Sequence, residues 1–558
     1  MKIIPLATLL SLSLCASSSA VAAPPADLLI TNAVVYADKP ANTLAVQDGI
    51  ITYVGNYSAA KKYLGPDTHV LDMEGAMVLP GFIDNHNHVF EAASEAGGSC
   101  ELSPHEGLEG QVRYLEDCAA QATPGQWLIG YGFILELILS EDNPQTPLEL
   151  LDDIFPELPV IFMEQTSHSM WVNSAALELA GITANSPEPQ GGKYLKDPDS
   201  GELNGILLDN AGDMVMELAW NSLNNVFQQS YDGLQNGLAE AAAHGITTIG
   251  DGRMYWKRGW YEIWKAAQEK GELSARVSLR PWIYPEDDPA AQLRFLKSIQ
   301  SREPDSRLIV DQVKMYSDGI LINGTAKVIA PYKNSFVKDL PYGLNYIPPE
   351  DMKFWLSELN RISYGAHIHA IGDGAIRESL NAVEYARQQG SEQDYSLTHV
   401  EMIQDSDIKR LRPLNVTADF QVGSDYIVEQ DHSWAEPFIG KKRAHSLMRL
   451  RPVFDSGANL TLSSDWNVND INPLVGIANS LSMKKTGLPN IEAAIDAYTL
   501  NPAISLGLDD ITGSITVGKS ADLVVLAEDI TRLDAGKIAE TEILMTILQG
   551  EIVYDSEQ

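Results

Sequence analysis

Cysteine is scarce in this sequence, with three residues among 558. One of them, Cys15, lies in the apolar N-terminal stretch, which leaves Cys100 and Cys118 for the rest of the chain. Two cysteines in an exported protein can form one disulfide. Their spacing permits that bond, and two free thiols remain the alternative. Nothing around either residue marks it as a catalytic nucleophile.

Basic residues are also scarce. The chain has 39 lysines and arginines against 76 aspartates and glutamates, which gives a formal net charge of −37. Such a charge repels phosphate backbones and anionic lipid headgroups, so neither nucleic acid nor an acidic membrane is expected as a partner. The excess of acid suggests a saline or periplasmic setting and leaves the chemistry open.

Long hydrophobic runs are absent beyond the N-terminus, so we expect no membrane span in the mature chain. Residues 1–23 have the pattern of a secretory signal peptide. A positive charge at position 2 precedes an apolar run over 3–14, and small residues then allow cleavage near Ala22 or Ala23. Leu14 stands where a lipoprotein signal has a small residue, which makes lipid attachment the weaker alternative. The sequence therefore predicts an exported, periplasmic protein.

The middle of the chain alternates apolar runs of strand length with segments of helical periodicity. With 44% hydrophobic residues, the chain can bury a large core over more than one domain. Alternating strands and helices favour parallel βαβ units, and eight of them fit a (β/α)8, or TIM, barrel over residues 81–508. The strands are predicted at 77–83, 245–250, 277–283, 312–316, 366–369, 396–400, 416–420 and 460–464.

Two other regions depart from this alternation of strands and helices. Residues 96–228, after the first strand, are too long for one crossover and have strand, helix and turn signals of their own. They predict an inserted subdomain over the barrel mouth. Short strand patterns fill 24–80 and 509–558, including one at 513–518. These two ends predict one small composite β-sandwich domain, with two unrelated sheets as the alternative.

Side chains that can carry chemistry recur at the predicted strand ends. His86 and His88 end the first strand, and residues two apart on a strand point to the same face, so both imidazoles can reach one metal ion. Later strands end in Lys314, His367, His369, His399 and Asp465. Each has a structural alternative, such as an ion pair between Lys314 and Asp318. Their joint order at the carboxyl ends of barrel strands favours a metal site.

These landmarks resemble the amidohydrolase superfamily, in particular its YtcJ-like (amidohydrolase-3) branch, from residue 28 to residue 554. The matching stretches are 78–88, 314–319, 369–373, His399, 464–466, 472–474 and 518–526, and 167–174 is similar to part of that branch's insert. One departure is Gly374, where the branch more often has arginine, and it removes no ligand. The resemblance is specific for the family and not for a substrate.

The resemblance implies a metal centre whose ligands are His86, His88, Lys314, His369, His399 and Asp465. His86 and His88 hold the more buried ion, and His369 and His399 hold the second. Lys314 is carboxylated and bridges both ions, because a lysine ammonium has no acceptor and cannot ligate. Asp465 binds the first ion and acts as general base for an activated water. Zinc is the first expectation, with iron or manganese as alternatives, and without carboxylation the site holds one ion.

The expected activity is hydrolysis of a non-peptide C–N bond, of amide, N-acyl or formamide type, in a small-molecule substrate. A deaminase, an ester or lactone hydrolase, and a metal-free binding or regulatory homologue are the alternatives. Candidate substrate contacts are His168, Trp171, Asn173, Tyr316, Asp318, Arg253 and Gln421, although Trp171 can also simply pack the insert. Asp373 is a candidate for orienting His369, and His367 for supporting the ligands. The oligomeric state stays open, with a homodimer as one option.

Overall fold

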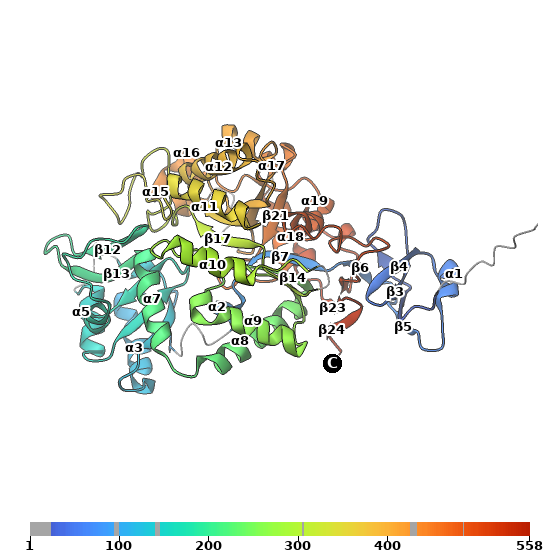
Figure 1. Cartoon of the computed structure of the whole chain (residues 1–558), viewed down its shortest axis with the longest axis horizontal. Coiled ribbons are helices and arrows are strands. Elements are labelled where there is room, and N and C mark those ends of the chain that lie inside the picture. The colour runs from blue at the N-terminus through green and yellow to red at the C-terminus, as the bar shows by residue number, and fades with distance from the viewer. Residues whose placement is uncertain are drawn as a thin grey trace, which may run out of the picture.

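The computed structural model describes residues 24–93, 100–139, 145–303, 306–424, 432–483 and 485–557. The predicted signal peptide, and the predicted start of the insert at residue 96, lie outside the described residues. The described chain has an α/β fold of the TIM-barrel type, with the inserted segment and the N-terminal strands at opposite ends (Figure 1). None of the helices in the described ranges has the length and apolar character needed to cross a bilayer.

The central strands run parallel and overlap the predicted strands, except that the first begins later than predicted. They are β7 (Phe82–Asn87), β14 (Ile246–Asp251), β15 (Arg276–Ser278), β16 (Leu308–Ile309), β17 (Gln312–Tyr316), β18 (Gly365–Ala370), β19 (Tyr395–His399), β20 (Val416–Gln421) and β21 (Leu460–Ser463). They form two sheets, β16-β15-β14-β7 and β17-β18-β19-β20-β21. Isolated parallel bridges, Trp282–Lys314 and Asn87–Trp466, link the sheets on both sides. Among the described residues, no continuous ladder closes the ring.

The first predicted strand is two strands in the structure. β6 (Met77–Pro80) pairs with a C-terminal strand outside the barrel, and β7 begins after Gly81. A Cβ at Gly81 would lie 2.2 Å from the Thr247 side chain, so a residue larger than glycine does not fit beside β14. The barrel strand therefore begins later than predicted, and His86 lies within it.

Helices pack outside these strands (Figure 1) and bury apolar side chains in the main core. In α9 (Trp260–Lys270) the buried residues follow the three-and-four spacing of a helical stripe: Trp260, Ile263, Trp264 and Ala267. Other helices of the barrel layer are α8 (Val226–Ala243), α10 (Pro289–Ile299), α11 (Pro349–Arg361), α12 (Asp373–Gln388), α13 (Asp405–Leu411) and α18 (Pro473–Ser482).

The two ends of the chain build two further sheets. One has the order β4-β3-β1-β5 and consists of β1 (Leu28–Thr31), β3 (Thr43–Gln47), β4 (Ile50–Gly55) and β5 (His69–Asp72). The other has the order β2-β6-β22-β23-β24 and adds β2 (Val34–Val35), β22 (Leu523–Leu526), β23 (Ile543–Leu548) and β24 (Glu551–Asp555). One hydrophobic cluster joins both sheets and includes Ile30, Val46, Val525 and Ile547. The strand predicted at 513–518 is wrong, because the segment bends at Gly513 and Gly518, where φ is 82° and 96°.

The inserted segment folds around a sheet of its own, in the order β12-β13-β11-β10-β9-β8. Its strands are β8 (Cys100–Glu101), β9 (Leu128–Phe133), β10 (Val160–Glu164), β11 (Ser169–Val172), β12 (Gly192–Lys196) and β13 (Leu203–Asp209). Its main helices are α3 (Leu108–Gln121), α5 (Pro147–Ile154), α6 (Ser174–Ala180) and α7 (Asn210–Ser222). A separate hydrophobic cluster stabilises this sheet and includes Phe133, Phe162 and Trp171.

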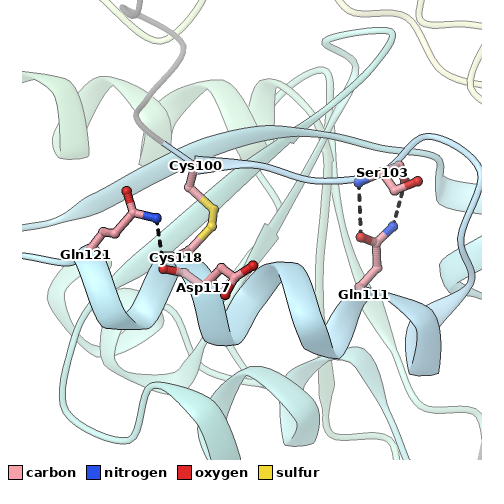
Figure 2. Close-up of a disulfide and its surroundings, with 6 residues drawn as sticks. All are labelled: Cys100, Ser103, Gln111, Asp117, Cys118 and Gln121. Atoms are coloured by element: carbon pink, nitrogen blue, oxygen red, sulfur yellow. Dashed lines mark hydrogen bonds between the residues drawn. A yellow bond between two sulfur atoms is a disulfide. The ribbon is translucent and has the colours of Figure 1, made fainter.

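The two remaining cysteines are joined in the insert. Cys100 in β8 and Cys118 in α3 form a disulfide with their Cα atoms 5.4 Å apart (Figure 2). Nearby, the Gln111 side chain donates to the Ser103 carbonyl oxygen at 2.7 Å and accepts from Ser103 N at 3.2 Å. These bonds attach α3 to the segment after β8. Of the two predicted alternatives, a disulfide or two free thiols, the structure has the disulfide.

Replacing both cysteines by alanine is expected to lower the free energy of unfolding of the insert. The loss should be about 3 kcal/mol, because the bond closes a loop with a sequence separation of 18 residues. Denaturant unfolding of the oxidised protein measures this loss. A reducing agent should move the wild type to the midpoint of the variant and leave the variant unchanged. Equal midpoints for the oxidised wild type and the variant would contradict the prediction.

Candidate metal centre

The carboxyl ends of the parallel strands carry a tight cluster of ligand-type side chains. Strand register explains part of it, since Lys314 in β17 lies opposite His367 in β18, and Ala370 in β18 lies opposite His399 in β19. After β21, the backbone N–H of Asp465 donates to the His86 carbonyl oxygen at 2.8 Å. We name the six predicted ligands the ligand cluster: His86, His88, Lys314, His369, His399 and Asp465.

Three atoms of the ligand cluster have the spacing that a metal ion requires. His86 Nε2 lies 3.2 Å from His88 Nε2, and the two nitrogens lie 3.3 and 3.1 Å from Asp465 Oδ1. Ligand atoms about 2.1 Å from a tetrahedral zinc ion are about 3.4 Å apart. Lys314 Nζ lies 3.2 Å from the same His86 nitrogen. The residues present therefore fit a divalent cation.

His369 provides a second observation that fits a cation. Its Nε2 lies 3.1 Å from the carbonyl oxygen of Gly319. A carbonyl oxygen only accepts hydrogen bonds, so Nε2 carries the ring proton and donates it. Its buried Nδ1 has no hydrogen-bond partner among the residues that the structure describes. The His369 ring lies 4.4 Å from the ring of His399. A buried, unpaired ring nitrogen is costly, and its lone pair suits a metal ion.

Polar side chains behind the ligand cluster contact and orient two of its histidines. His86 Nδ1 lies 2.6 Å from His367 Nε2, and His367 Nδ1 lies 2.6 Å from the Ser396 hydroxyl. His88 Nδ1 lies 3.4 Å from a carboxylate oxygen of Glu91. Such partners determine which ring nitrogen faces a metal and raise its basicity.

Burial keeps three histidines neutral, as metal ligation requires. It lowers the pKa of His399 to about 3 and holds the pKa values of His86 and His369 well below their usual range. Burial by itself raises the pKa of Asp465. Hydrogen bonds from His86 and His88 outweigh that effect and hold the pKa of Asp465 well below its usual range. The cluster thus places three neutral imidazoles beside a carboxylate, whereas Glu91 and Asp465 outweigh burial and raise the pKa of His88.

Lys314 is a buried amine in the middle of the ligand cluster. Burial lowers its pKa well below the usual range. Its Nζ lies 3.2 and 3.4 Å from the two ring nitrogens of His86 and 5.3 Å from the centre of the Tyr316 ring. The alternative ion pair with Asp318 is not found among the described contacts. Asp318 instead accepts hydrogen bonds from the backbone N–H groups of Lys327, Ile371 and Gly372.

Three predicted substrate contacts reach the ligand cluster. The ring of His168, from the insert, stacks on Tyr316 at 5.2 Å and lies 5.0 Å from the ring of His369. Arg253, after β14, donates to the Tyr316 hydroxyl at 2.9 Å. These three side chains therefore form a wall beside the candidate metal ligands.

Trp171 and Asn173 lie in the insert instead. Trp171 is fully buried, with its ring 5.7 Å from Phe133 and 6.1 Å from Phe162, and its indole N–H donates to the Pro147 carbonyl oxygen. Asn173 caps α6 with its side-chain oxygen, and its amide donates to two carbonyl groups. These contacts give both side chains a structural role in place of the predicted contact with substrate.

Gln421 and Asp373 also have partners of their own. Gln421 donates to the Asp419 carboxylate at 2.9 Å, within a buried polar network of the barrel. Asp373 was a candidate for orienting His369, but its carboxylate accepts hydrogen bonds from Gln404 and from a backbone N–H. The interpretation of Asp373 is therefore corrected, because its oxygens bind elsewhere.

Sequence reasoning missed two carboxylates near the cluster. Glu91 joins His88 to Arg253, at distances of 3.4 and 3.1 Å. Burial raises the pKa of Glu91, but these two neighbours outweigh it and lower that pKa to about 2. The spacing of three residues from His88 on a helical turn is the signal that reveals Glu91. Asp209 contacts His168 across 41 residues and has no local signal.

Comparison with known proteins agrees with this geometry. A sequence model of the amidohydrolase family matches residues 69–554. Because the match spans most of the chain, the protein belongs to the amidohydrolase family. Membership of this family makes it a hydrolase that acts on carbon–nitrogen bonds other than peptide bonds.

Individual relatives match along nearly their whole length. The amidohydrolase-named protein YtcJ of Bacillus subtilis is 26% identical over 527 residues, covering 91% of this chain and 95% of its own. The N-substituted formamide deformylase of Arthrobacter pascens is 27% identical over 557 residues, covering 95% and 98%. A metal-dependent hydrolase structure from Pyrococcus horikoshii has a TM-score of 0.70 at 20% identity, covering 91% and 99%. That structural likeness supports the fold.

Proposed function

We propose that this protein hydrolyses an amide, N-acyl or formamide-type bond in a small molecule, with one or two divalent metal ions, zinc first. The observation that carries the proposal is the spacing of His86 Nε2, His88 Nε2 and Asp465 Oδ1, which are 3.1 to 3.3 Å apart. Similarity to a protein named for deformylating N-substituted formamides supports the formamide part. Shorter similarity to imidazolonepropionases supports C–N chemistry more broadly.

The residues of the chain suit this reaction. A divalent ion bound in the ligand cluster would polarise the carbonyl group of the substrate and lower the pKa of a bound water molecule. A divalent ion bound beside Asp465 would favour its carboxylate form, because a nearby positive charge lowers the pKa of a carboxyl group. Asp465 can therefore take a proton from the attacking water and give it to the leaving nitrogen. This transfer lets the amine leave in its neutral form.

We further propose that Lys314 is N6-carboxylated and bridges two ions. A neutral amine attacks carbon dioxide, forms a nitrogen–carbon bond and releases one proton. Burial favours the neutral amine because it lowers the pKa of Lys314. The resulting carbamate is an anionic oxygen ligand, which an ammonium cannot be. An uncarboxylated Lys314 would leave a site for one ion.

Three details of the fold are also proposals: the closure of the barrel, the terminal β-sandwich and the position of the insert. We propose that the parallel strands belong to one closed (β/α)8 barrel, and the isolated Trp282–Lys314 and Asn87–Trp466 bridges between the two sheets support this proposal. The terminal sheets form the composite β-sandwich, and the insert lies over the barrel mouth, with the domain limits predicted above. Export to the periplasm with cleavage near Ala22 or Ala23, and a homodimeric assembly, stay predictions.

A substrate panel with metal-depleted and zinc-reconstituted protein tests the proposed function. The panel contains N-substituted formamides, N-acyl amino acids, an amine-bearing heterocycle, an ester, a lactone and a dipeptide. We expect metal-dependent release of an amine from the first two classes. Ammonia release from the heterocycle alone would favour a deaminase. Hydrolysis of only the ester or lactone would overturn the proposed substrate class.

A further inference from the structure

The insert contributes a histidine–aspartate pair to the wall of the metal centre. His168 precedes β11, and its Nδ1 lies 2.7 Å from Oδ1 of Asp209 at the end of β13. The rings of His168, Tyr316 and His369 pack together: the His168 ring lies 5.2 and 5.0 Å from the other two, which are 4.2 Å apart. Two insert residues therefore reach a cluster whose ligands all come from the barrel.

Several contacts hold this pair in one orientation. The backbone N–H of Asp209 donates to the His168 carbonyl oxygen at 2.8 Å, in addition to the side-chain bond. Asp209 has a positive φ of 50°, a strained conformation that its surroundings must enforce. A Cβ at Gly319 would lie 2.6 Å from an Asp209 carboxylate oxygen, and the Gly319 carbonyl oxygen contacts His369. The pair is thus packed directly beside the ligand cluster.

The bond to Asp209 determines what His168 offers to a substrate. A carboxylate only accepts hydrogen bonds, so the Nδ1 atom of His168 carries the proton. In the neutral ring, Nε2 then has a lone pair and accepts a hydrogen bond. The His168 side chain keeps 7% of its surface accessible, so it is not sealed. Within the described residues, no hydrogen-bond partner of this Nε2 is found.

We propose that His168 Nε2 accepts a hydrogen bond from the N–H of the scissile amide, and that the enzyme therefore selects amides that carry an N–H. This inference rests on the proposed function and adds the substrate class. N,N-disubstituted amides and esters lack that N–H. They leave a nearly buried acceptor unpaired, which weakens binding of the transition state. His168 is thus a specificity-determining residue supplied by the insert.

A matched pair of substrates tests this inference, using the zinc-loaded full chain. The pair is an N-alkyl formamide and its N-methyl homologue, compared by kcat/KM. The wild type should prefer the first by about 10–100-fold. His168→Phe keeps a ring to stack on Tyr316 but removes the acceptor, so the preference should fall to near one while metal content is unchanged. His445→Phe changes an exposed histidine 3.2 Å from Glu436 and should keep the preference.

Asp209→Asn provides a second, independent variant. The asparagine amide can donate to His168 Nδ1, which moves the ring proton to Nε2 and turns the acceptor into a donor. The preference for the N–H substrate should fall in this variant, with metal content unchanged. Equal loss of activity on both substrates in His168→Phe and Asp209→Asn would overturn the inference and leave the proposed function standing. If the metal-loaded wild type hydrolyses neither amide, the proposed function fails, and this inference fails with it.

Discussion

Replacing Asp465 by alanine is expected to lower kcat by at least about 10³-fold and to reduce the metal content. Asp465 Oδ1 lies 3.3 Å from His86 Nε2 and 3.1 Å from His88 Nε2, so the change removes a candidate ligand and the proposed base together. Elemental analysis gives metal per chain, and kcat on the best substrate of the panel gives the catalytic loss.

Two further variants separate these effects. Asp465→Asn keeps an oxygen ligand of the same shape but cannot take the proton, so it should retain more metal than Asp465→Ala while activity stays low. Asp510→Ala removes an exposed carboxylate away from the site and should change neither quantity. Full metal content with near-wild-type kcat in Asp465→Ala would contradict both roles of this residue.

Replacing Lys314 by methionine is expected to remove one metal ion and abolish most hydrolysis. Methionine fills the buried space but has no nitrogen to carboxylate, so metal should fall from about two ions to about one per chain. The loss in kcat should exceed the about 10–100-fold that losing a supporting residue costs. Elemental analysis and kinetics on protein purified without a chelator measure both changes. Lys519→Met, a half-buried lysine outside the site, is the matched control.

Chemical rescue and spectroscopy test the bridging role of Lys314 directly. Acetate added to Lys314→Ala supplies an anionic oxygen ligand and should restore part of the metal content and activity. Carbon-13 NMR of wild type in labelled bicarbonate should show a carbamate signal that Lys314→Met lacks. One ion per chain in the wild type, unchanged in Lys314→Met, would show a mononuclear site and a lysine that does not bridge.

Most of the barrel was predictable because strand-length apolar runs are a local signal. The predicted strand at 312–316 has the same bounds as β17, and the strand at 416–420 differs from β20 by one residue. The first strand was mispredicted because β6 and β7 are separated only by Gly81 and form one apolar run. Only pairing partners distinguish them, since β6 pairs with β22 and β7 with β14.

Side-chain alternation explains which side chains around β11 face the metal centre. Residues along a strand point alternately to opposite faces. Around β11, Met170 packs in the main core cluster, whereas Trp171 packs in the separate cluster of the insert. His168 shares the parity of Met170, and Asn173 shares that of Trp171. The segment resembling the family's insert therefore contains one residue that reaches the metal centre and two that stabilise the insert.

The sequence by itself determined the parallel strand–helix order and the candidate ligands at strand ends, because both depend on residue types and spacings over a few positions. The tertiary structure alone decided the Cys100–Cys118 bond, the split between β6 and β7, and the pairing of His168 with Asp209. Each of these depends on contacts between separate elements, and no local period encodes which distant residues meet.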